Sequence, residues 1–70
     1  MEKAELSKSI EARKLNKRTM RANSPDLVTI PFGGILDKIE QNDYVMTFHY
    51  LGEPYETDLM RVKGALKPID

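Results

Sequence analysis

The sequence predicts a small, mostly β fold in which short antiparallel strands form a barrel or a strongly bent sheet. Its 70 residues suffice for one small domain. After position 26, apolar and polar residues alternate over several short stretches, and turn-forming residues separate these stretches at intervals of roughly ten positions. A closed sheet exposes fewer strand edges than an open one, so this pattern favours a small antiparallel barrel.

The first part of the chain predicts a helix instead. Residues 2–17 contain no glycine or proline and many strong helix formers. Acidic residues lie near the start of this segment and basic residues near its end, which is the order that the helix dipole favours. Its apolar face is weak, because Leu6 and Ile10 share one side while Leu15 falls on the other. We therefore expect a basic helical arm, residues 1–18, followed by a β-barrel domain, residues 19–70.

The barrel domain should open with a turn and an edge strand. Residues 23–26 (NSPD) are typical of a turn, because proline fixes φ and the other three side chains can bond nearby backbone. Residues 28–32 (VTIPF) then alternate between large apolar and other side chains, which predicts a strand with one buried face. Pro31 places this strand at an edge or a bulge, and the glycine pair 33–34 ends it.

Three further strands are expected in the middle of the chain. Residues 35–40 (ILDKIE) predict a short strand, and the polar residues 41–43 predict a turn. Residues 44–51 (YVMTFHYL) predict the strongest strand, because they are rich in aromatic and β-branched side chains. Gly52-Glu53 should close a hairpin along which residues 54–57 return.

The end of the chain predicts one helical turn and a last strand. Asp58 can cap a turn over residues 59–63, and Gly64 ends it. Residues 66–69 then complete the sheet.

This order of parts resembles a bacterial Src-homology-3-like (SH3-like) domain over residues 19–69. The shared parts are a first strand near 18–21, a turn at 23–25, a strand that ends at 32–34, a strand at 35–40, a hairpin over 44–57, and a helical turn before the strand at 66–69. The resemblance implies the fold. The chain has no tryptophan and no Ala-Leu-Tyr-Asp-Tyr segment, so the proline-rich peptide groove of the eukaryotic domains is not carried over.

The aromatic residues supply both core and candidate surface. Phe32 and Phe48 are expected inside the barrel together with Met46. The three tyrosines each carry a hydroxyl that needs water or a partner, so they can also form a shallow docking surface near the Gly52 hairpin. The expected contacts with a protein or peptide partner are Tyr44, Tyr50, Glu53 and Tyr55. Half-buried tyrosines that only cap the core are the other interpretation.

A cluster of basic residues supports an alternative function. Five cations within nine positions can follow a nucleic-acid backbone, namely Arg13, Lys14, Lys17, Arg18 and Arg21. However, 11 basic and 11 acidic residues give the chain a formal net charge of zero, and no aromatic side chain interleaves the cluster. A solvated helix end explains the same charges, so nucleic acid is the less favoured partner.

Other function classes lack the residues they need. The chain has no cysteine and a single histidine, His49, and its acidic residues show no metal-ligand spacing. No nucleophile, base and oxyanion set is evident, and no phosphate-binding glycine loop surrounds Gly33. We therefore expect a non-catalytic interaction module without cofactor or metal. No apolar run spans a membrane, which favours a cytoplasmic protein, and the marginal core predicts self-association.

Overall fold

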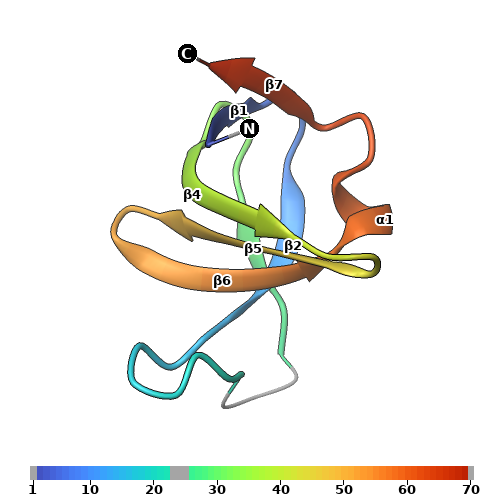
Figure 1. Cartoon of the computed structure of the whole chain (residues 1–70). Helices are drawn as coiled ribbons and strands as arrows, with labels where there is room; N and C mark the ends of the chain where they lie inside the picture. The colour runs from blue at the N-terminus through green and yellow to red at the C-terminus, as the bar shows by residue number, and fades with distance from the viewer. Residues whose placement is uncertain (1, 23–25, 70) are drawn as a thin grey trace.

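In the part of the chain that the structure describes, seven strands form one antiparallel sheet that curls into a half-barrel (Figure 1). The computed structural model describes residues 2–22 and 26–69. Along the sheet the strands follow the order β3-β2-β6-β5-β4-β1-β7. The elements are β1 Lys3–Leu6, β2 Ile10–Lys14, β3 Val28–Ile30, β4 Ile35–Gln41, β5 Val45–Tyr50, β6 Glu53–Asp58, the helical turn α1 Leu59–Val62 and β7 Leu66–Ile69. The mostly β, antiparallel architecture and the helical turn before the last strand are confirmed.

The N-terminal helix expected over residues 2–17 is wrong, because β1 and β2 occupy this segment. Ala4 and Leu6 are buried in β1, and Ile10 and Ala12 are buried in β2, while the residues between them face outward or lie at intermediate depth. This is the period of two that a half-buried strand requires. Both strands pair with distant parts of the chain, so residues 3–14 lie inside the sheet and do not form a helical arm beside it.

Residues 16–21 form a closed loop, so the strand expected near 18–21 is also wrong. The side-chain oxygen of Asn16 accepts hydrogen bonds from the backbone N–H groups of Arg18 and Thr19, at 2.8 and 3.2 Å. The backbone N–H of Asn16 donates to the carbonyl of Arg21 at 2.8 Å, and a β-bridge joins Leu15 to Ala22. The asparagine thus satisfies backbone groups locally and turns the chain back on itself. The turn expected at 23–25 lies outside the described residues.

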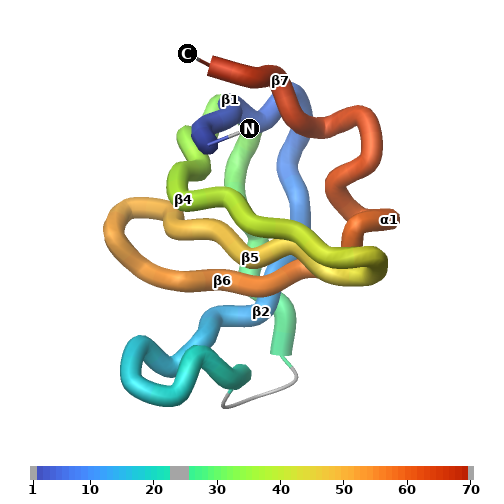
Figure 2. Tube along the Cα trace, in the orientation of Figure 1, coloured from blue at the N-terminus to red at the C-terminus, as the bar shows by residue number. Residues whose placement is uncertain are grey.

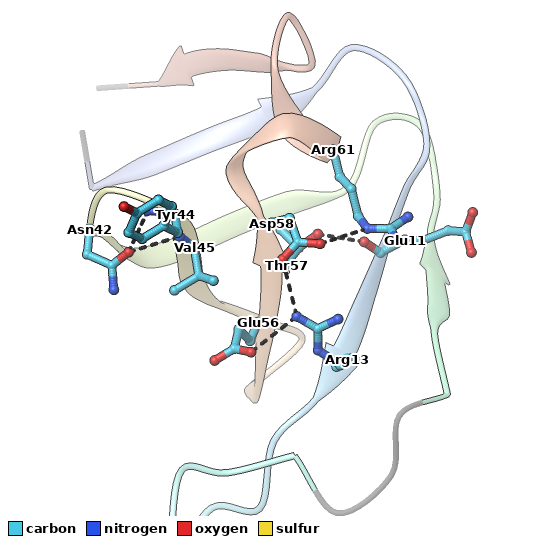
Figure 3. Close-up of polar contacts among 9 residues, drawn as sticks. All are labelled: Glu11, Arg13, Asn42, Tyr44, Val45, Glu56, Thr57, Asp58 and Arg61. Atoms are coloured by element: carbon cyan, nitrogen blue, oxygen red, sulfur yellow. Dashed lines mark hydrogen bonds and ion pairs between the residues drawn. The ribbon is translucent and has the colours of Figure 1, made fainter.

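The meander β4-β5-β6 agrees with its sequence signals. Tyr50 pairs with Glu53, so the hairpin turn consists of Leu51 and Gly52 alone. Both have positive φ, +52° and +82°, as a type I′ turn requires. At the other end of β5, the side chain of Asn42 accepts hydrogen bonds from the backbone N–H groups of Tyr44 and Val45, at 2.8 and 2.9 Å (Figure 3).

Phe32, which follows β3, does not lie in the core. β3 lies at an edge of the sheet, as Pro31 indicates. The chain then turns through Pro31–Gly34, where Gly34 N–H donates to the Pro31 carbonyl at 3.0 Å and Gly33 has φ +83°, as in a type II turn. Phe32 occupies the outer corner of this turn and is 74% exposed, so its expected place in the core is wrong. Met46 and Phe48 are buried as expected.

The concave side of the curled sheet holds the core. Its buried members are Leu6, Ile10, Ala12, Ile30, Leu36, Met46, Phe48, Tyr55, Val62 and Ala65. One buried polar side chain, Thr57, donates its hydroxyl to the carbonyl of Glu11 at 2.7 Å and so ties β6 to β2 (Figure 3). Asp58 occupies the N-cap position of α1, as expected, but its side chain makes no capping hydrogen bond. Its carboxylate contacts Arg13 and Arg61 instead.

Candidate functional site

The tyrosines expected to form one docking surface separate into core and surface. Tyr55 is only 9% exposed, and its ring stacks on Phe48 with centroids 5.7 Å apart. Tyr50 meets the edge of Tyr55 at 6.4 Å and packs against the core. Glu53 lies at the same hairpin and forms an ion pair with Lys17 at 3.4 Å. Of the four expected contacts, Tyr50 and Tyr55 therefore serve mainly to build the sheet interior.

Tyr44 lies at the opposite end of β5 and is 81% exposed. Its backbone carbonyl accepts a hydrogen bond from Leu59 N–H at 2.9 Å, which places the β4–β5 turn beside α1 (Figures 1 and 2). The next residue in α1, Met60, is also 81% exposed. We call this pair of exposed side chains on bonded neighbouring segments the Tyr44–Met60 end. Met60 was not among the expected contacts, because a single helical turn carries no periodic pattern that distinguishes its outward face.

Arg13 is a structural cation. Its guanidinium lies 3.3 Å from the carboxylate of Glu56 and 3.5 Å from that of Asp58, and its side chain is only 23% exposed (Figure 3). Asp58 also contacts Arg61 at 3.4 Å. These ion pairs join β2, β6 and α1 on the convex side of the sheet. Arg13 is therefore compensated by acids and not presented to a phosphate backbone.

The other basic residues expected to bind nucleic acid lie in and beside the loop of residues 16–21. Lys14 and Lys17 line a hollow of about 460 Å³ with Val28 and with Glu53, the ion-pair partner of Lys17. Arg18 and Arg21 are exposed in the loop. Two of the five cations are thus ion-paired with carboxylates, which weakens the positive potential that such an interface needs.

His49 lies on the convex face of β5, in register with Asp37 of β4 and Pro54 of β6. Its Nδ1 atom is buried and has no hydrogen-bond partner. Among residues 2–22 and 26–69, no group of three or more His, Cys, Asp or Glu side chains is arranged to hold a metal ion. Within the same ranges, no helix is long and apolar enough to cross a membrane.

Comparison of the chain with protein-family models, with curated proteins and with solved structures finds no match in any of the three.

Proposed function

We propose that this chain is a small non-catalytic module that binds a protein or peptide partner through the Tyr44–Met60 end. One observation carries the proposal: two large side chains, each 81% exposed, lie on adjacent segments that the Leu59–Tyr44 hydrogen bond holds together. Single exposed apolar residues are common on protein surfaces, whereas contiguous patches of them mark interaction sites. Aromatic and methionine side chains are also enriched in protein interfaces.

The backbone under this surface is already fixed. Asn42 bonds the N–H groups of both Tyr44 and Val45, and the Tyr44 carbonyl bonds Leu59. A preorganised anchor loses little conformational entropy when a partner covers it. An exposed charged residue adjoins each member of the pair in sequence, Asp43 beside Tyr44 in the turn and Arg61 beside Met60 in α1. An apolar centre with a charged rim is the arrangement of a typical protein interface.

We propose the SH3-like fold as the finer description of the barrel. The β4-β5-β6 meander, the helical turn after it and a last strand that pairs with the first strand all support this resemblance. The first strand is then β1, because residues 18–21 form a loop. Cytoplasmic location and self-association belong to the same proposal. Sedimentation at micromolar concentration tests self-association, and a stable monomer would contradict it.

Photo-crosslinking and affinity purification test the partner. The full chain, with a photo-crosslinking amino acid at position 44 or at position 51, is expressed in its native cell and purified with and without nuclease. Leu51 is 83% exposed at the opposite end of β5, which makes it a matched control. We expect a protein adduct from position 44 and none from position 51.

The captured partner is then purified and its affinity measured. We expect Tyr44→Ala combined with Met60→Ala to weaken binding by about tenfold or more, as for two interface anchors at about 1 kcal/mol each, and Leu51→Ala to leave it unchanged. Equal loss from both variants, or no loss from the double variant, refutes the proposed site. Capture that disappears with nuclease identifies the alternative, a nucleic-acid-binding barrel. The logarithm of its affinity for DNA or RNA should then fall linearly with the logarithm of the salt concentration.

A further inference from the structure

Two neighbouring hollows lie along β4 and β5, and we treat them as one trough. They share Glu40 and Thr47, which are in register across the two strands. The smaller hollow, about 280 Å³, is lined by Glu40, Gln41, Asn42, Val45 and Thr47, and the larger, about 370 Å³, by Glu2, Met20, Lys38, Ile39, Glu40, Thr47 and His49. We call this the β4–β5 trough. From Val45 to His49 it spans about 13 Å, the length of four or five residues of extended chain.

The trough depends on an irregular backbone. The pairing of β4 with β5 shifts between Asp37 and Glu40, and Lys38 within this bulge has φ +49°. Met20, which reaches the trough from the loop of residues 16–21, has φ +57°. These are two of the three non-glycine residues with positive φ in the described part of the chain. Such conformations and bulges concentrate at functional sites, where they re-aim side chains.

His49 adds a polar group that the fold leaves unused. Its Nδ1 is the one buried side-chain nitrogen or oxygen without a hydrogen-bond partner among residues 2–22 and 26–69. No side-chain hydrogen bond within the described residues holds this nitrogen in place, and a half-turn of the ring about χ2 would exchange it with a ring carbon. A neutral imidazole carries one acceptor nitrogen, which a ligand N–H can then satisfy.

The charges of the trough favour a cation. Glu2 and Glu40 line it, and Asp37 stands directly opposite His49 on the same face. Lys38 is the one lysine or arginine among the residues that line the two hollows. Within the described ranges none of these four charged residues forms an ion pair, whereas Glu56 and Asp58, further along the same face, are neutralised by Arg13. The two lining carboxylates outnumber the one lining ammonium, and Asp37 adds a third carboxylate beside His49, so the trough has a net negative charge.

We propose that the β4–β5 trough binds an extended partner segment that carries an arginine or lysine, with the cation between Glu40 and Glu2. The aliphatic stem of such a side chain would cover Met20 and Ile39 while its N–H groups reach the carboxylates and the imidazole of His49. Asn42 and Val45 line the trough end that adjoins Tyr44. The inference rests on the proposed peptide-binding function and names the chemistry of its partner.

Titration of the ¹⁵N-labelled full chain with short peptides tests this by amide chemical shifts. The probes are acetyl-Ala-Ala-Arg-Ala-Ala-amide and two analogues in which uncharged citrulline or glutamate replaces the arginine. We expect the arginine peptide to shift the amides of residues 38–41 and 46–49. One solvent-screened ion pair contributes up to about 1 kcal/mol, so the citrulline peptide should bind about two- to fivefold more weakly and the glutamate peptide more weakly still.

Two variants assign the effect to the trough. Glu40→Gln should weaken binding of the arginine peptide by about two- to fivefold. Glu11 is an exposed carboxylate on β2, so Glu11→Gln should leave this affinity unchanged. Shifts that map elsewhere, equal binding of the arginine and citrulline peptides, or no effect of Glu40→Gln each overturn the inference. The proposed function has its own test: it is refuted if Tyr44→Ala combined with Met60→Ala does not weaken binding of the captured partner.

Discussion

The β4-β5-β6 meander and the N-terminal strands β1 and β2 are built in opposite ways. Each strand of the meander pairs with its neighbour in sequence through a tight turn, one fixed by Asn42 and the other by Leu51-Gly52. β1 instead pairs with β4 and β7, at least 30 and 60 positions away, and β2 pairs with β3 and β6. The meander is therefore specified locally, whereas β1 and β2 acquire their structure from distant partners.

This difference has an entropic consequence. Two-residue turns bring the strands of the meander together at a small loop-closure cost. Pairing β1 with β7 closes almost the whole chain, and contacts of such separation form late and slowly in folding. We therefore expect the meander to organise first and the N-terminal strands to be the part that depends most on the finished core.

The largest expected effect on stability comes from Leu6→Ala, which removes a buried side chain of β1. Leu6 is 1% exposed and packs in the same cluster as Phe48 of the meander. Removing a buried leucine side chain should cost about 2–5 kcal/mol, a large part of the roughly 4–10 kcal/mol expected for 70 residues. Urea unfolding measures this loss.

Hydrogen exchange on the same variant shows whether the two regions unfold together. Because one core joins the two regions, amides of β5 and β6 should lose protection together with those of β1. Protection retained in the meander alone would show that β1 and β2 are an independent appendage.

A smaller effect is expected from Thr57→Val, which removes one link between the two regions. The Thr57 hydroxyl is buried and donates to the Glu11 carbonyl of β2. Valine has a similar shape but leaves that carbonyl without its donor, so we expect a loss of about 1–3 kcal/mol in urea unfolding. Thr47→Val is the matched control, because the half-buried Thr47 hydroxyl makes no hydrogen bond within the described residues. Equal losses from both variants would contradict a specific role for the link.

The smallest effect is a gain within the meander itself. Leu51 holds φ +52° in the hairpin turn, a conformation that costs a leucine more than an asparagine. Asn-Gly is the preferred pair for this turn, so Leu51→Asn should stabilise the protein by about 0.5–1 kcal/mol and raise Tm by several degrees. Thermal unfolding followed by circular dichroism measures the change. Leu51→Ala lacks the side-chain amide, so a gain of the same size from alanine would refute the turn explanation.

The same contrast explains how much of the candidate site could be predicted from the sequence. Tyr44 follows a polar turn signal, and its exposed position agrees with its expected role as a surface residue. Tyr50 and Tyr55 have the same side chain, but the register of the hairpin turns Tyr55 onto Phe48 and Tyr50 against Tyr55. Met60 reaches the surface because α1 packs only Leu59 and Val62 against the core. Tyrosines thus differ in role because strand pairing decides which of them face the core, and composition does not reveal that pairing.

The sequence alone determined the turns and the strands that they join. Asn42 and the Leu51-Gly52 pair act on their immediate neighbours, and the alternation through residues 45–50 matches the one buried face that the meander presents. The conformation of residues 3–14, in contrast, depends on tertiary contacts. Helix propensities differ by a few tenths of a kcal/mol per residue, whereas burial of Leu6 and Ile10 in the common core contributes about 1.5–3 kcal/mol each. That burial requires alternate residues to face the core, so these residues form strands against their local preference.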